Sequence, residues 1–193
     1  MHHRGELLRI VDNTTTLLGD DMKRELAGAS KCRVAAACFS IYAFDALKSE
    51  LGRLKEFECI FTSPTFIPNG AVDRLKKERR EFFIPLARPE GALSGSEFEI
   101  QLRNKMTQRA VARECAEWIR KKARFKSNAT AAPMQQFAHI QKSGTETAYM
   151  PLSGFTAVDL GYQRGDAVSS YTQVMDEPPF AQTYLNLFDQ IWH

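Results

Sequence analysis

The chain has 193 residues, of which 44% are hydrophobic and 25% charged, and its formal net charge is +3. This composition predicts a single domain over residues 1–193 with a sizeable hydrophobic core. No apolar stretch is long enough to span a bilayer, and the N-terminus lacks a signal-peptide pattern. We therefore expect a cytoplasmic protein that has no membrane partner.

The cysteines show none of the spacings that are typical of metal ligands. Three of the four lie in or beside apolar runs, which favours buried free thiols in a reducing compartment. We therefore expect no disulfide, no metal and no cofactor. The cysteines are Cys32, Cys38, Cys59 and Cys115.

The stretch from Arg33 to Pro64 has the clearest pattern in the chain. The apolar run Val34–Ile41 predicts a strand that is covered on both faces. Leucines and a phenylalanine at spacings of three and four predict a helix over Ala43–Lys55, and Phe57–Thr62 predicts a second strand. Strand, helix and strand in this order predict a βαβ unit with parallel strands.

The other elements are expected on both sides of this unit. Acidic residues and a following glycine favour a short helix over Gly19–Ala27. Ser96 and Glu99 form a capping-box pattern that predicts the start of the longest helix. The remaining predictions are a helix over Ala71–Arg80, strands over Ala123–Asn128, Phe137–Gln141, Ala148–Pro151 and Thr156–Leu160, and a helix over Gln182–His193.

Basic residues are concentrated in two regions. Residues 74–80 hold five Lys or Arg against one Glu, and residues 101–126 hold nine against two. Two interpretations are open for the long helix: a solvated amphipathic face, or a face that follows nucleic-acid phosphates. For the second interpretation, the candidate phosphate ligands are Lys76, Lys77, Arg80, Arg109, Arg113, Arg120, Lys121 and Lys126.

Several short strings are spread over nearly the whole chain: Ile10-Val11-Asp12-Asn13, Leu18-Gly19-Asp20-Asp21, Phe39-Ser40-Ile41-Tyr42, Phe61-Thr62-Ser63-Pro64, Glu97-Phe98-Glu99-Ile100, Arg113-Glu114-Cys115-Ala116, Gly154-Phe155-Thr156 and Phe188-Asp189-Gln190-Ile191-Trp192. Together they resemble the N-terminal phospholipase D-like region of bacterial Swi/Snf-type (superfamily two) helicases. The resemblance implies an α/β fold, with a mixed sheet flanked by helices on both faces. It also implies DNA as a partner, a helicase motor after His193 and a setting in anti-phage defence or DNA processing.

The chemistry of the phospholipase D superfamily uses a motif in which a His is followed by Lys two positions on and by Asp after four more residues. The best match here is His139 with Glu146 in the Asp position, while Gln141 stands where the cationic Lys is expected. Lys142 cannot replace it, because neighbouring residues of a strand point to opposite faces. Losing such a donor costs roughly 3 to 4 kcal/mol of transition-state stabilisation. A degenerate, non-catalytic site is therefore expected.

Three functions stay open at the level of the sequence. The first is a non-catalytic module that binds nucleic-acid phosphates for an attached helicase or ATPase. The second is a metal-independent nuclease that uses His139, with a second copy of the chain as partner, since single-motif members build one active site from two chains. The third is a protein-docking module, suggested by the acidic C-terminal third of the chain and by the apolar final helix that contains Trp192.

Overall fold

The computed structural model describes residues 9–62, 97–130, 133–163, 171–176 and 178–193, and for residues 97–107, 178 and 180 it describes the backbone alone. Within these ranges the fold is a mixed α/β arrangement built on a seven-stranded sheet in the order β1-β7-β6-β5-β2-β3-β4. The strands are β1 (Arg9–Val11), β2 (Lys31–Ala36), β3 (Glu56–Phe61), β4 (Ala123–Ser127), β5 (Phe137–Gln141), β6 (Glu146–Met150) and β7 (Thr172–Met175).

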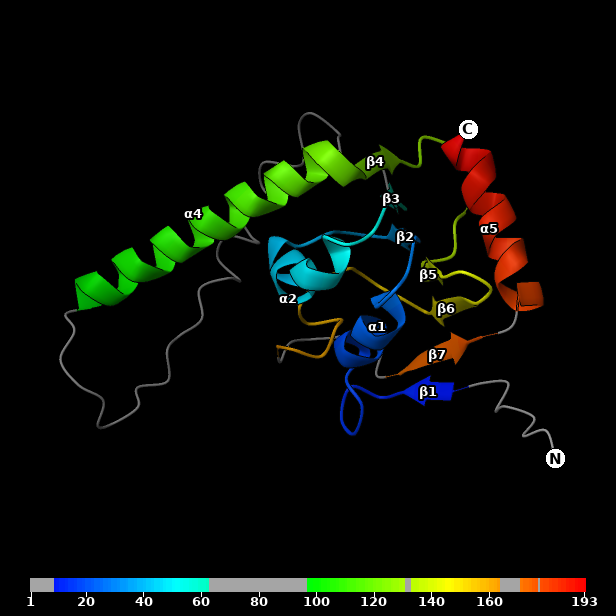
Figure 1. Cartoon of the computed structure of the whole chain (residues 1–193), viewed down its shortest axis with the longest axis horizontal. Helices are drawn as coiled ribbons and strands as arrows, with labels where there is room; N and C mark the ends of the chain where they lie inside the picture. The colour runs from blue at the N-terminus through cyan, green and yellow to red at the C-terminus, as the bar shows by residue number, and fades with distance from the viewer. Residues whose placement is uncertain (1–8, 63–96, 131–132, 164–170, 177) are drawn as a thin grey trace.

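The helices lie on both faces of this sheet, as expected (Figure 1). Helices α1 (Leu18–Leu26), α2 (Ile41–Leu51) and α4 (Glu97–Lys122) are on one side, and α5 (Pro178–Trp192) is on the other. The larger core lies under α1, α2 and α4, and it includes Leu47, Phe57 and Trp118. A smaller core, which includes Phe137 and Phe188, lies under α5.

The central βαβ prediction is confirmed, with corrected boundaries. Strand β2 pairs in parallel with β3, and β3 with β4. Strand β2 begins at Lys31 and ends at Ala36, so the predicted strand over Val34–Ile41 started and ended too late. The reason is a helix cap: the Ser40 side chain accepts a hydrogen bond from the backbone N–H of Tyr42 at 3.1 Å, so α2 begins at Ile41.

The other half of the sheet is antiparallel, and its outer part was not predicted. Strand β5 pairs with β2 and β6, and β7 joins β6 to the edge strand β1. Both β1 and β7 are absent from the sequence-based expectation. Conversely, the strand predicted over Thr156–Leu160 is wrong, because these residues form turns.

These turns hold the start of α1 in place. The side chain of Asn13 accepts a hydrogen bond from the Leu18 N–H at 2.7 Å and donates one to the Asp159 carbonyl at 2.9 Å. The Gly19 N–H donates to the Leu160 carbonyl at 2.9 Å. A turn conformation lets these carbonyl groups bond outside the sheet, which a strand could not do.

The remaining predictions of helices and strands differ in outcome. The helices near residues 19–27 and 182–193 and the strands near residues 123–128 and 137–141 are confirmed to within a few residues. The long helix ends at Lys122, where β4 follows directly. None of the four cysteines, all of which lie in described ranges, forms a disulfide; Cys38 is exposed and the other three are buried. The predicted helix over Ala71–Arg80 and the Ser96 cap lie outside the described residues.

Candidate nucleic-acid interface

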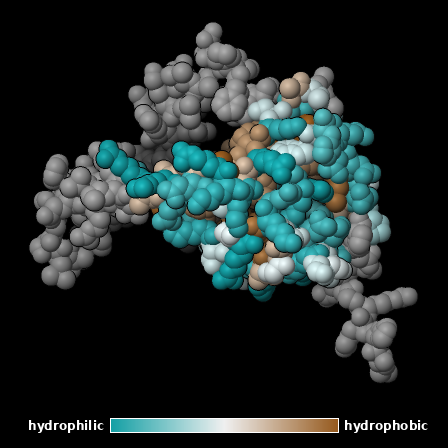
Figure 2. Space-filling view, turned by 45° about the horizontal axis from the view of Figure 1, so that its top comes forward, coloured by the Kyte–Doolittle hydropathy of each residue, from teal (hydrophilic) through white to brown (hydrophobic). Residues whose placement is uncertain are grey.

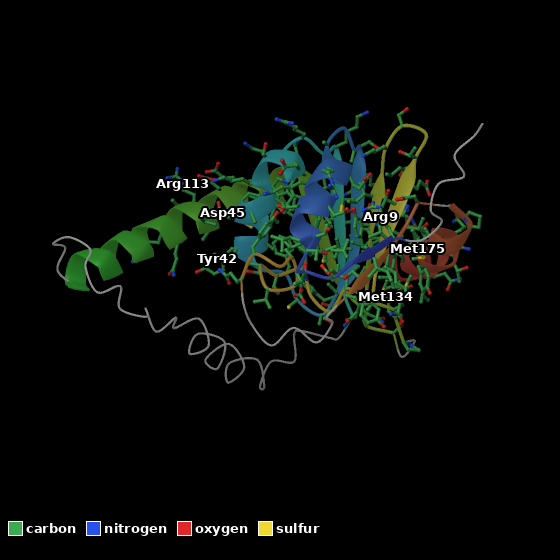
Figure 3. The ribbon with its side chains drawn as sticks, turned by 90° about the horizontal axis from the view of Figure 1, so that it is seen from below. Arg9, Tyr42, Asp45, Arg113, Met134 and Met175 are labelled. Carbon is green, nitrogen blue, oxygen red and sulfur yellow. The ribbon has the colours of Figure 1, made fainter. Side chains whose placement is uncertain are left out.

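The outer side of α4 carries a stripe of arginines. Val111, Cys115 and Trp118 face the core, so the arginines at positions 109, 113 and 120 fall on the opposite side and are exposed. We call Arg109, Arg113 and Arg120 the α4 stripe. Figure 3 shows Arg113 on the outer side of the helix. The inward and outward faces that the sequence predicted for this helix are therefore both confirmed.

The cations of this region differ in whether a neighbour already neutralises them. Arg113 is 83% exposed and pairs with Glu117 at 3.4 Å, one helical turn along. Within the described part of the chain, Arg109, Arg120 and Lys121 have no acidic partner. In the space-filling view, hydrophilic side chains predominate over the coloured part of α4 and the surface beside it (Figure 2). The stripe therefore has net positive charge that is open to solvent.

The other predicted phosphate ligands are placed differently. Lys126 lies on β4, where its ammonium donates a hydrogen bond to the Trp192 carbonyl and sits 5.1 Å from the centre of the Trp192 ring. This lysine fastens the end of α5 to the sheet edge, which leaves it less available to a ligand. Lys76, Lys77 and Arg80 lie outside the described residues.

The packing of α4 fixes the direction of the stripe. The Trp118 indole N–H donates to the Leu51 carbonyl at 3.1 Å, and the Lys122 ammonium donates to the carbonyls of Gly52 and, at 2.8 Å, Leu54. These carbonyls belong to the end of α2 and the turn after it, where no further turn of helix follows to supply the usual backbone donors. The last turns of α4 are therefore held rigidly, with the arginines turned to solvent.

The two residues of the degenerate phospholipase D-type motif are brought together. His139 Nε2 lies 3.4 Å from Glu146 Oε2, joining β5 to β6. The side chain of His139 is only 1% exposed. Lys142 points to the opposite face, as expected, and its ammonium pairs with Glu25 of α1 at 2.8 Å. Gln141 remains the residue in the position where the motif has Lys.

His139 belongs to a row of charged side chains that crosses the sheet beside α5. Arg33 lies opposite His139 on β5 and opposite Glu58 on β3. Its Nε is 3.3 Å from Glu58, and its Nη2 is 3.9 Å from Asp189 of α5. Burial lowers the pKa of His139, the Arg33 charge acts in the same direction, and Glu146 and Asp189 oppose them. The histidine is therefore kept neutral in a row whose charges are paired.

A second charged cluster joins α1 to the outer strands, and sequence reasoning missed it. Asp21 is 1% exposed and accepts hydrogen bonds from Arg9, Arg24 and, at 2.9 Å, the Tyr149 hydroxyl. Burial alone would raise the pKa of Asp21, but these hydrogen bonds outweigh it and hold the pKa below its ordinary value. The side chains come from α1, β1 and β6, so no local spacing could have revealed the cluster. All of its members are paired, which indicates a structural role.

The described residues contain no group of three or more His, Cys, Asp or Glu side chains that could hold a metal ion. None of the helices in the described ranges is long and apolar enough to cross a membrane. No protein-family model matches the chain, and no curated protein matches it either.

Proposed function

We propose that this chain is a degenerate phospholipase D-like accessory domain that binds nucleic-acid phosphates for an attached DNA-dependent helicase or ATPase. The observation that carries the proposal is the α4 stripe, where Arg109 and Arg120 are exposed on one helix face without acidic partners in the described region. Cations in the last turn of a helix, such as Arg120, stabilise the helix because they offset its dipole. Arg109 lies well before the last turn of α4, so this effect does not account for its presence. Contacts of this kind are made to phosphates and carry no sequence preference.

The burial of His139 supports a binding role over a catalytic one. A phosphorus nucleophile needs access to its substrate, whereas the His139 side chain is 1% exposed beneath the α5 face. The cation that would steady phosphate oxygens is replaced by Gln141, and the nearest cation, Arg33, is engaged by Glu58 and Asp189. The charge of Arg33 is therefore already neutralised by carboxylates of the same chain, and Arg33 is not available to bind a phosphate.

The apolar final helix, one of the two features that suggested the docking alternative, packs against its own chain, which favours nucleic-acid binding over docking. Phe188 and Trp192, the apolar residues that suggested a partner surface, are buried against the sheet of the same chain. Phe188 stacks on Trp192 with ring centres 5.5 Å apart and makes an edge contact with Phe137. The apolar face of α5 is thus already covered.

The test is a salt titration of binding to a fluorescently labelled DNA duplex, followed by anisotropy. We expect the double variant R109Q/R120Q to bind severalfold more weakly and to lower the steepness of the log–log salt dependence by about 1.8, because two phosphate contacts are lost. The matched control is K23Q/K142Q, which removes the same charge from residues that contact Tyr162 and Glu25. Equal behaviour of the two variants would overturn the proposal.

A further inference from the structure

The turn between α2 and β3 carries two further cations that sequence reasoning did not assign. Arg53 and Lys55 are exposed, and Leu54 between them is fully buried. The buried leucine anchors the turn and forces its two neighbours outward. Neither Arg53 nor Lys55 has an acidic partner among the residues that the structure describes.

The turn is attached to the end of α4, far away in the sequence. The Lys122 ammonium donates to the carbonyls of Gly52 and Leu54, so α4 ends against the turn. Lys121 and Gly52 line the same shallow hollow. The turn that carries Arg53 and Lys55 is therefore fixed to the end of α4 that carries the exposed Lys121.

Apart from Glu50 in the last turn of α2, the acidic residues around this point are engaged in ion pairs. Glu114 pairs with Lys48 at 3.2 Å and Glu117 pairs with Arg113. Glu56, the next residue after the turn, is held by Lys31 at 3.1 Å and Arg124 at 3.2 Å. The positive charge of Arg53, Lys55 and Lys121 is thus left over after pairing.

We propose that Arg53, Lys55 and Lys121 form a second phosphate-contact point and that the partner is a nucleic-acid duplex; this inference rests on the proposed function. Along a helix that rises about 1.5 Å per residue, Lys121 lies about 12 Å from Arg113 and about 18 Å from Arg109. The major groove of a duplex is about 12 Å wide. Arg120 of the α4 stripe is the neighbour of Lys121, so the groove-wide separation holds between this contact point and the Arg109–Arg113 end of the stripe. These two ends are therefore spaced to meet the two backbones that border one groove.

A single strand fits this surface less well. Proteins that bind single strands combine a basic groove with aromatic side chains on which bases stack. Among the described residues, the large apolar side chains that are exposed are Ile10 and Tyr171. The aromatic one, Tyr171, directly precedes β7, and Ile10 lies on β1, so both are at the end of the sheet away from β4. The helix and the turn thus hold their positive charges at fixed positions, and the phosphates of a duplex are likewise held at fixed positions.

The experiment compares R53Q/K55Q with the wild-type chain and with K23Q/K142Q, using a labelled 20-base-pair duplex and one of its strands alone. We expect R53Q/K55Q to bind the duplex severalfold more weakly, with a salt dependence less steep by about 1.8. We also expect the wild-type chain to prefer the duplex. Thermal melts of each variant check that the fold is retained, because both substituted side chains are exposed.

The outcomes separate this inference from the proposed function. If R109Q/R120Q weakens duplex binding but R53Q/K55Q matches the control, the second contact point is refuted while the proposed function stands. If the single strand binds as tightly as the duplex and loses as much affinity in R53Q/K55Q, the assignment to a duplex is refuted. If the wild-type chain binds neither ligand at low salt, the proposed function itself fails.

Discussion

Gly161 occupies a position where both backbone and space exclude a side chain. Its φ is +82°, and a Cβ there would lie 2.6 Å from Asn13 Oδ1, the atom that holds the start of α1. We expect Gly161→Ala to lower the free energy of unfolding by more than the roughly 1–2 kcal/mol of a left-handed backbone alone. Urea denaturation measures the loss.

Gly28 provides the matched control for this substitution. It has the same φ of +82°, but a Cβ there would meet nothing within 4 Å. Gly28→Ala should therefore show the backbone cost by itself. Equal losses in the two variants would mean that the contact between residue 161 and Asn13 has no effect on stability.

His139 should make the fold sensitive to acid. Because its pKa is lowered in the folded state, the unfolded chain binds the proton more readily as the pH falls through the ordinary histidine range. The stabilising contribution is therefore present above the unfolded pKa of about 6.5 and is lost as the pH drops below it. Urea denaturation at pH 8 and pH 5.5 should show a lower free energy of unfolding at the acidic pH.

A His139→Gln variant separates this effect from the titration of other groups. Glutamine keeps a polar group near the position of Nε2, which faces Glu146, but it does not titrate. The difference between the two pH values should shrink in this variant. If it stays as large as in the wild-type chain, His139 does not cause the acid sensitivity.

At the level of elements, α5 depends on apolar packing against one half of the sheet. Phe188 is fully buried and contacts Phe137 of β5 and Trp192 one turn along. We expect Phe188→Ala to destabilise the fold by about 3–5 kcal/mol, because it leaves a cavity between the helix and the sheet. The thermal midpoint measures this loss.

Trp192 fluorescence reports whether α5 itself is affected. Trp192 is buried and lies beside Lys126, so detachment of the helix should shift the tryptophan emission, to which the buried Trp118 also contributes, to longer wavelength. The exposed Asn186 of the same helix serves as control, since Asn186→Ala removes no buried surface. A Phe188→Ala protein as stable as this control would contradict the assignment of α5 to the core.

For the whole molecule, we expect binding of DNA without cleavage. The one histidine that matches the phospholipase D-type motif is buried, and its neighbouring cation, Arg33, is paired with Glu58 and Asp189. Incubation of a labelled duplex with the full chain in chelator, followed by a denaturing gel, should leave the DNA intact. Cleavage that disappears in His139→Ala would instead support a nuclease.

The parts of the fold that were predicted are those whose signals are local. The apolar stripe of α2 and the apolar run that begins at Val34 in β2 each lie within one short segment. Strands β1 and β7, of three and four residues, have no such signal. They are strands because they pair with one another and with β6, and this pairing depends on a chain that has already folded.

The short strings that carry the phospholipase D-like resemblance show the same difference between local signals and contacts that only the folded chain makes. In Leu18-Gly19-Asp20-Asp21, the glycine allows close approach of the Tyr162 ring, and Tyr162 donates a hydrogen bond to Asp20 at 2.8 Å. Asp21 is the buried acceptor for Arg9. The contacts of Gly19 and Asp20 with Tyr162 join segments more than 100 residues apart, so the string could be noticed in the sequence but not explained from it.

The sequence by itself determined the α/β class, the parallel βαβ centre and the two faces of α4, because each depends on the periodicity of neighbouring residues. Only the tertiary structure decided which charges remain free. Lys126 and Arg33 are held by partners from α5 and β3, whereas Arg53 and Lys55 are left exposed beside the end of α4. Ion pairing depends on distances between segments that are remote in the chain, and the number of basic residues in a stretch does not contain this information.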